Sequence, residues 1–212
     1  MNDLLLNDIV PIKIYTLDKS SFHSERYADK VIVVTEAELK KLSNLKTPNG
    51  VIGVFEIDQD NKSTLHPASQ WGFAFENLQD PGNLGTILRT MDWLGIQHIY
   101  CSNDSVDVYN PKVVQATMGA IARVKVQYVD LESFLIAQDV PIYAADMAGV
   151  PINTTPLEAG IIVFGNEGNG LSDTIKHIAD QLISIPKYGY GESLNVAMSA
   201  GMIGAWLTMN NR

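Results

Sequence analysis

Patterns typical of strands and of helices alternate along the chain from residue 71 onward. Short apolar runs are each followed by a stretch with helical spacing of its apolar residues. This alternation predicts an α/β fold with a mostly parallel sheet and helices on both faces. The expected strands are Trp71–Phe75, Ile99–Ser102, Val124–Val129, Pro141–Ala145, Ile161–Phe164 and Leu182–Ile185. The expected helices are Leu84–Trp93, Pro111–Met118, Leu131–Gln138, Leu171–Ala179 and Ser193–Met209.

The first 60 residues carry a separate set of patterns. Strands are expected at Ile12–Tyr15, Val31–Val34 and Val51–Phe55, and a short helix within 20–27. A helix Glu36–Leu42 is also expected, because Thr35 and Glu38 have the spacing of a capping box. From Asp58 to Gln70 the chain is polar and has no period, which predicts a domain boundary.

The composition permits a buried core and disfavours several classes of protein. Hydrophobic residues make up 46% of the 212 residues and charged residues 18%. No apolar run approaches the roughly 18 residues that a membrane span needs, and no signal peptide is expected. The four histidines are scattered and Cys101 is the single cysteine, so we expect no metal site, no disulfide, and a reducing, cytoplasmic environment. A net charge of −9 by itself disfavours a nucleic-acid partner.

Three expected strand ends carry glycines and polar side chains. Ligands of parallel α/β sheets bind outside the carboxyl ends of the strands. After Phe75, Asp80 begins a turn, Asn83 is expected to cap a helix, and Arg89 lies almost two turns into that helix. An isolated arginine is usually a solvated or ion-paired surface charge. Because the residues around Arg89 are largely apolar, we expect an anionic partner for it, either a carboxylate or a phosphate.

A loop with three glycines follows the second of these strand ends. Gly165, Gly168 and Gly170 lie between the expected strand Ile161–Phe164 and the next helix. Glycines allow a ligand to approach the backbone closely. The spacing matches neither a Walker A loop nor the G-x-G-x-x-G fingerprint. The residues alone therefore support an adenine-type ligand and a simple tight turn about equally.

The third strand end is followed by a polar loop and an apolar helix. Pro186 ends the strand, and the helix is expected to open at Glu192 or Ser193. Ser193 and Asn195 then lie at its mouth, among free backbone N–H groups. Small and apolar residues make up nearly the whole helix, which predicts burial on most sides. Met118, Met198 and Met202 are accordingly expected to fill the core.

Together, these three segments resemble the three motifs of the SpoU (TrmH-type) RNA 2′-O-ribose methyltransferases of the SPOUT superfamily. Order and spacing agree over residues 71–210. The matching motifs are Asn77-x-x-Asp80-Pro-Gly-Asn83-x-Gly-x-Ile-x-Arg89-Thr90, Phe164-Gly-Asn-Glu167-Gly-x-Gly170-Leu, and Ile185-Pro-x-x-Gly followed by Glu192-Ser-Leu-Asn195-Val.

The resemblance implies a fold and a reaction. It implies a C-terminal trefoil knot that holds S-adenosyl-L-methionine, a homodimer formed by the same region, and a ribose hydroxyl of rRNA or tRNA as methyl acceptor. Residues 71–212 would form the methyltransferase domain. Residues 1–60 resemble the later part of an L30e-like substrate-binding domain.

The resemblance also assigns roles to individual residues. It implies Arg89 as the catalytic arginine, with a supporting set of Asn83, Glu167, Ser193 and Asn195. The implied cofactor contacts are Gly165, Glu167, Gly168, Ile185 and Leu194. A guanidinium does not readily give up a proton, so we expect Arg89 to hold a phosphate and stabilise oxyanion charge.

Two alternative functions stay open from the sequence. One is a catalytically inactive module that binds the cofactor or RNA. The other is a different α/β enzyme that uses an adenine nucleotide.

Overall fold

The computed structural model describes residues 2–7, 9–18, 25–43, 45, 47–57 and 66–210. The chain divides into two units, residues 1–60 and 61–212. The polar segment at which a boundary was expected lies largely outside the described residues, which exclude 58–65.

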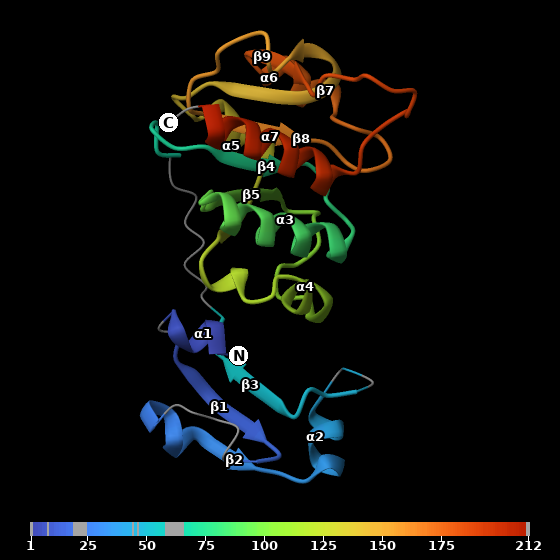
Figure 1. The fold of residues 1–212 in the computed structure, drawn as a ribbon. Coiled ribbons are helices and arrows are strands. Elements are labelled where there is room, and N and C mark those ends of the chain that lie inside the picture. The colour runs from blue at the N-terminus through green and yellow to red at the C-terminus, as the bar shows by residue number, and fades with distance from the viewer. Residues whose placement is uncertain are drawn as a thin grey trace. The chain divides into compact units, whose positions relative to one another are not determined.

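A six-stranded sheet is the centre of the second unit (Figure 1). Its strand order is β6-β5-β4-β8-β7-β9, and every neighbouring pair is parallel. Phe75 lies opposite both Cys101 and Phe164, so three central strands end at one level. The strands are β4 Gly72–Phe75, β5 His98–Ser102, β6 Lys125–Val129, β7 Ile142–Pro151, β8 Ile161–Phe164 and β9 Gln181–Ser184. The predicted parallel α/β fold is confirmed.

Helices cover both faces of this sheet. On one face, α3 (Pro81–Leu94) and α7 (Val196–Asn210) pack over the stacked rings of Phe73, Phe75 and Phe164. On the other face, α5 (Leu131–Ile136) and α6 (Asp173–Ile178) cover a second apolar cluster. The helix α4 (Pro111–Ala116) lies beside α3, and a 3-10 turn, η3, spans Ala120–Ala122.

Helix α7 packs on one side only, which corrects the prediction of burial on most sides. Small residues allow its close approach to α3, since a Cβ at Gly204 would lie 2.8 Å from Leu94 Cδ1. On the opposite side, Met198 and Met202 are 58% and 45% exposed, and Trp206 continues the same stripe at helical spacing. Met118 is also exposed. The prediction that these methionines fill the core is therefore wrong.

Several predicted boundaries move for local reasons. Helix α4 ends at Ala116, before the predicted Met118, because Met118 and Gly119 both have positive φ. Strand β7 continues to Pro151, well beyond the predicted Ala145. The starts of α3 and α7 also differ from the prediction, and both changes concern the candidate site.

The first unit contains a three-stranded sheet in the order β2-β1-β3. Strand β1 (Pro11–Thr16) pairs in parallel with β2 (Val31–Val33) and antiparallel with β3 (Val51–Phe55). Helix α2 (Glu36–Leu42) begins with both hydrogen bonds of the predicted capping box. The other helices are α1 (Asn2–Leu6) and the 3-10 helix η2 (Glu25–Lys30). Of the helix predicted within 20–27, residues 20–24 lie outside the described residues.

Candidate active site at the carboxyl ends of the strands

Three side chains from distant parts of the second unit form a hydrogen-bonded chain. Asn83 Nδ2 donates to Glu167 Oε1 at 3.0 Å, and Asn195 Nδ2 donates to Asn83 Oδ1 at 3.0 Å. Asn83 lies in α3, Glu167 in the loop after β8, and Asn195 directly before α7. The three segments predicted to form one site therefore meet at Asn83.

Asn83 can make both contacts because it is not the helix cap. Helix α3 begins at Pro81, and Asp80 Oδ1 accepts a hydrogen bond from Asn83 N at 2.8 Å. The prediction of Asn83 as N-cap is wrong because Pro81 suits the first helical position, where no N–H is needed. Asp80 thus caps the helix, and the amide group of Asn83 stays available for Glu167 and Asn195.

Asn195 is the cap of α7, although the helix was predicted to open earlier. Its Oδ1 accepts from Ala197 N at 2.9 Å and from Met198 N at 3.4 Å. Residues 187–195 before it are all exposed, so no packing holds a helical turn there. Because Oδ1 is fixed by the helix start, the side-chain NH₂ group is directed at Asn83.

The glycine loop after β8 is a tight hairpin. Asn166 and Gly170 exchange two backbone hydrogen bonds of 3.0 and 2.9 Å, and Gly170 has a φ of +71°. A Cβ at Gly165 would overlap the backbone of Gly170 and Leu171. Gly165 is therefore required by packing within the loop. Glu167 is presented at the exposed tip of the hairpin, with Gly168 beside it.

Two polar residues that were not predicted for the site tie its loops together. Glu76 Oε2 accepts from Ser172 N at 2.8 Å, and Asn166 Nδ2 donates to Asn77 O at 2.8 Å. Both contacts join the segment after β4 to the segment after β8. The sequence did carry a signal, since Glu76 and Asn166 are the first polar residues after two buried strands.

Arg89 lies on α3, six residues beyond Asn83, which is about 9 Å along the helix axis. Its side chain is exposed. The described part of the chain provides no hydrogen bond or ion pair for it. In contrast, Arg123 is held by Asp92, with Nη2 and Oδ2 2.7 Å apart. The guanidinium of Arg89 is therefore available to an anion from outside the chain.

The remaining predicted residues lie in or beside the loop that leads to α7. Ser193 is exposed and Leu194 is 55% exposed, while Ile185 is half-buried against the core. Neither Ser193 nor Leu194 shares in the hydrogen bonds around Asn83 found among the described residues. The structure thus joins Asn83, Glu167 and Asn195 directly. Ser193 and Leu194 are close to Asn195 in the sequence.

From the sequence, Lys112, Arg123, Lys125 and Lys187 are the basic residues besides Arg89 that are expected near this edge of the sheet, and the structure bears this out for only two of them. Lys125 is the first residue of β6, opposite His98 at the start of β5, and so lies at the amino ends of the strands. Arg123 lies two residues before β6, at the same end, and is paired with Asp92. Both expectations are therefore wrong, whereas Lys112 and Lys187 are exposed on segments that follow β5 and β9.

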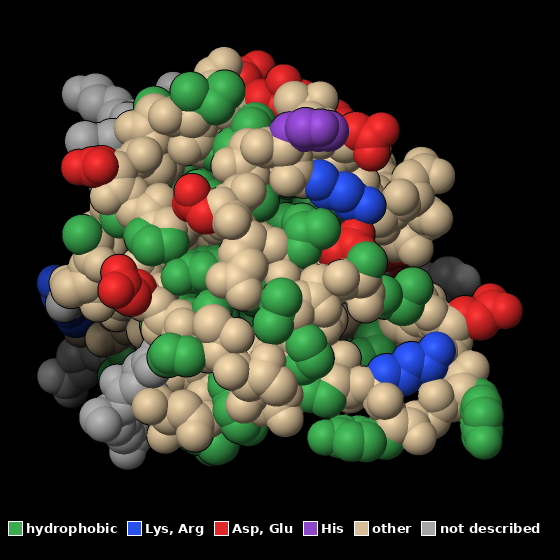
Figure 2. Space-filling view, turned by 90° about the horizontal axis from the view of Figure 1, so that it is seen from above, with side chains coloured by type: hydrophobic (Ala, Val, Ile, Leu, Met, Phe, Trp, Pro, Cys, Tyr) green, Lys and Arg blue, Asp and Glu red, His purple; other side chains and the backbone are tan. Residues whose placement is uncertain are grey.

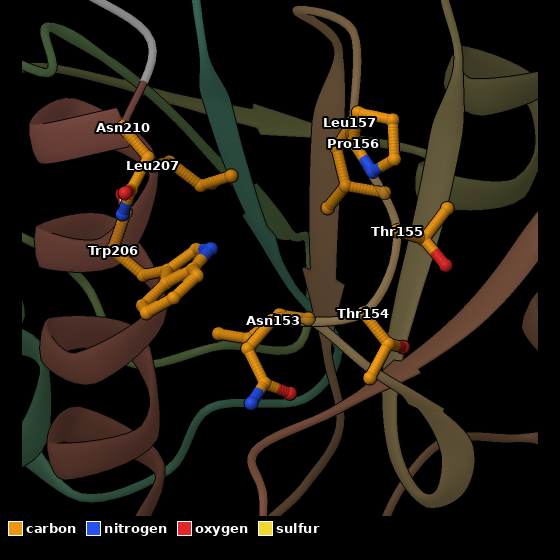
Figure 3. A pocket seen from close by; sticks show the side chains of 9 residues that line it. Asn153, Thr154, Thr155, Pro156, Leu157, Trp206, Leu207 and Asn210 are labelled. Atoms are coloured by element: carbon orange, nitrogen blue, oxygen red, sulfur yellow. The ribbon is translucent and has the colours of Figure 1, made fainter.

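A cavity of about 280 Å³ lies away from these residues (Figure 3). The last turns of α7 form one side of it, and Trp206 points from there toward the loop 152–157. None of the predicted site residues lines it. In the ranges that the structure describes, no group of three or more His, Cys, Asp and Glu side chains could hold a metal ion. No described helix is long and apolar enough to cross a membrane.

Comparison with known proteins gives a consistent result. The family model of the SpoU rRNA Methylase family matches residues 72–205. An uncharacterised tRNA/rRNA methyltransferase of Synechocystis is 33% identical over 81% of this chain and 64% of its own length. The 23S rRNA (guanosine(2553)-2′-O)-methyltransferase of Bacillus subtilis is 27% identical over 81% of this chain and 69% of its own length. The chain thus spans about two thirds of these relatives.

A solved structure shows the same fold. The AdoMet-bound rRNA methyltransferase of Sinorhizobium meliloti superposes with a TM-score of 0.84 at 24% identity. The superposition covers 99% of this chain and 83% of the other. Because it extends over nearly the whole chain, the likeness in fold is not confined to the residues that the family model matches.

Proposed function

The chain belongs to the SpoU rRNA methylase family, and we propose that it transfers a methyl group from S-adenosylmethionine to a ribose 2′-hydroxyl of RNA. The observation that carries this proposal is the hydrogen-bonded chain Glu167–Asn83–Asn195, which unites the three family motifs at one point. The Bacillus relative is named as a ribose 2′-O-methyltransferase, which supports the same reaction class. The acceptor would be rRNA or tRNA.

The residues around the three segments fit the proposed methyl donor. Half-buried Ile185 and exposed Leu194 offer apolar surface for an adenine ring. The hairpin tip at Glu167 and Gly168 is exposed and carries no side chain at Gly168 that would block a ligand. We assign Gly165, Glu167, Gly168, Ile185 and Leu194 to this cofactor. Bound there, S-adenosylmethionine would supply a methyl group on a positively charged sulfur.

Arg89 and the polar residues would then prepare the acceptor oxygen. Holding the reacting groups in line can lower the barrier by about 7–11 kcal/mol. Arg89 would bind a neighbouring RNA phosphate and stabilise the negative charge that develops on the 2′-oxygen. Asn195 is fixed by Asn83 and by the start of α7, and with Ser193 it would orient the ribose. Glu167 would keep Asn83 in place.

The exposed stripe of α7 supports a homodimer. Met198, Met202 and Trp206 form an apolar stripe at helical spacing that is 58%, 45% and 39% exposed. A second copy of the chain would bury this stripe. We also assign the trefoil knot to the same region. Support comes from the chain path, since β9 lies at one edge of the sheet, next to β7, whereas the following α7 packs against α3.

Two further predictions concern domains and location. We propose residues 71–212 as the methyltransferase domain and residues 1–60 as a partial L30e-like domain for substrate binding. We also propose that the protein acts in the cytoplasm. The buried free thiol of Cys101 is compatible with a reducing compartment.

Two measurements test the proposed function and separate it from its alternatives. Calorimetry should detect binding of S-adenosylmethionine and not of ATP or NAD. Tritium should then pass from labelled S-adenosylmethionine to bulk rRNA or tRNA. Cofactor binding without transfer would favour the inactive module. Binding of another adenine nucleotide in place of S-adenosylmethionine would contradict the proposal.

A further inference from the structure

Two tyrosines on the loop between β9 and α7 have almost no contact with the protein. Tyr188 is 92% exposed and Tyr190 is 103% exposed. Leaving a large apolar ring in water forgoes burial energy. Two such rings on one loop therefore indicate a surface that another molecule covers.

In the sequence, this loop connects two residues of the candidate site. It begins after Ile185, which we assign to the cofactor, and ends at Asn195, which is bonded to Asn83. In Figure 1 this segment projects outward from the sheet before it returns to α7. At the lower right of Figure 2, hydrophobic side chains lie near a basic one and an acidic one.

The conformation of this loop does not require glycine at either of its two glycine positions. A Cβ at Gly189 or at Gly191 would meet no atom within 4 Å, and neither residue has a positive φ. They leave the rings of Tyr188 and Tyr190 unshielded by neighbouring side chains and allow the backbone to adjust when a ligand arrives. This differs from Gly165, which packing requires.

The chemistry of the loop fits an unpaired nucleotide. Tyrosine rings stack on any base, because every base has a π-face. Alternate residues of a chain are at most about 7 Å apart at Cα, which is close to the separation of two rings with one base between them. Lys187, exposed and directly before Tyr188, can contact a phosphate of the same strand.

We propose that Tyr188 and Tyr190 stack on unpaired RNA bases next to the acceptor nucleotide and so position its ribose at Asn195. This inference rests on the proposed function, because it assumes that RNA reaches the site. Tyr188 and Tyr190 are positioning residues, and the reacting atoms are left to Arg89 and Asn195. The site therefore selects single-stranded or looped RNA over a continuous duplex.

Fluorescence measurements on the full chain test this proposal. The probe is a short single-stranded oligoadenylate that carries a dye at one end and a 2-aminopurine in the middle. The variants replace both tyrosines together by Phe, by Leu or by Ala. Ile136→Ala is the matched control, because Ile136 is 70% exposed at the end of α5, outside this loop.

We expect the Ala and Leu pairs to bind the probe more weakly by about tenfold or more for each ring lost. They should also no longer quench the 2-aminopurine. The Phe pair and Ile136→Ala should behave like the wild-type chain. Affinity for S-adenosylmethionine should be the same in all variants. If the Leu pair binds the probe as well as the Phe pair does, the stacking proposal is overturned, because leucine has no aromatic ring to stack.

Three further results distinguish a failure of this proposal from a dimer contact and from a failure of the proposed function. Equal RNA binding by the wild-type chain and the Ala pair overturns this proposal and leaves the proposed function intact. Loss of a dimer in the Ala pair, measured by light scattering, would show that the rings cover a second copy instead. A wild-type chain that binds neither oligoadenylate nor bulk rRNA would overturn both this proposal and the proposed function.

Discussion

The loops after β8 and after β9 are both rich in glycine and both lead to the candidate site, but they are built differently. The first is the hairpin 165–170, closed by two backbone hydrogen bonds and tied to the neighbouring strand end through Asn166 and Asn77. The second, residues 187–195, is exposed along its whole length. The hairpin therefore fixes Glu167, whereas the open loop is free to engage a ligand. Changes in the hairpin should affect stability, and changes in the open loop should affect binding.

The largest effect is expected for Gly165→Ala. The added Cβ would overlap the backbone of Gly170 and Leu171, and backbone cannot move aside as a side chain can. We expect a loss of about 3 kcal/mol or more in the free energy of unfolding, measured by urea denaturation. The matched change is Gly189→Ala, at a position with open space. Equal effects of the two substitutions would contradict the contrast between the loops.

Arg89→Ala should reduce activity by about 100- to 1,000-fold, because it removes a group that stabilises charge in the transition state. The free energy of unfolding should change by less than about 0.5 kcal/mol, since Arg89 is exposed. Methyl transfer to bulk RNA and thermal unfolding measure the two effects. Arg89→Lys should keep part of the activity if a point charge suffices. Undiminished transfer by Arg89→Ala would remove Arg89 from the mechanism.

Asn83→Ala should have an intermediate effect on both methyl transfer and the free energy of unfolding. It removes the hydrogen bonds to Glu167 and Asn195, each worth about 1 kcal/mol at most in such an accessible position. We expect methyl transfer to fall about tenfold or more, because Asn195 loses its fixed orientation. Asn153→Ala, in the cavity at the other end of α7, serves as a control. An equal loss in that variant would show that the effect is not specific to the site.

The smallest expected effect is a dependence of the free energy of unfolding on pH. It arises at the amino ends of the strands, far from both loops. Burial lowers the pKa of His66, whose Nδ1 and Nε2 lie 3.0 Å from Tyr100 Oη and 2.9 Å from Gln70 O. The folded state thus binds fewer protons than the unfolded state, where the pKa is about 6.5. The free energy of unfolding should fall as pH drops below about 6.5. Denaturation at several pH values would test this, and His66→Gln should flatten the dependence.

The sequence predicted elements well where the determining interactions are local. Helix Glu36–Leu42 and strands Val51–Phe55 and Ile161–Phe164 have the predicted bounds, because a capping box or a short apolar run defines each. The start of α7 was missed because Asn195 is also fixed by Asn83, 112 residues away. The side of α7 that packs on α3 could not be predicted, since this helix is apolar all round and offers no polar face as a guide.

The candidate site was predicted as three segments that meet, and the structure brings Asn83, Glu167 and Asn195 together. The sequence alone did not identify which neighbouring residues make the hydrogen bonds that support the site. The roles of Glu76 and Asn166 as ties between loops depend on hydrogen bonds to residues that only the folded chain places nearby. The role of Asp80 as cap is local, three residues from Asn83, and Pro81 at the first helical position was the signal for it. The catalytic and cofactor roles of the site residues stay predictions.

Nucleoside mass spectrometry tests the central claim most directly. Bulk rRNA and tRNA would be incubated with the chain and S-adenosylmethionine, digested to nucleosides, and analysed for the position of the new methyl group. The proposed reaction predicts a 2′-O-methylated nucleoside with the wild-type chain and none above background with Arg89→Ala. A methyl group on a base, or none on either RNA although the chain binds the cofactor, would contradict it.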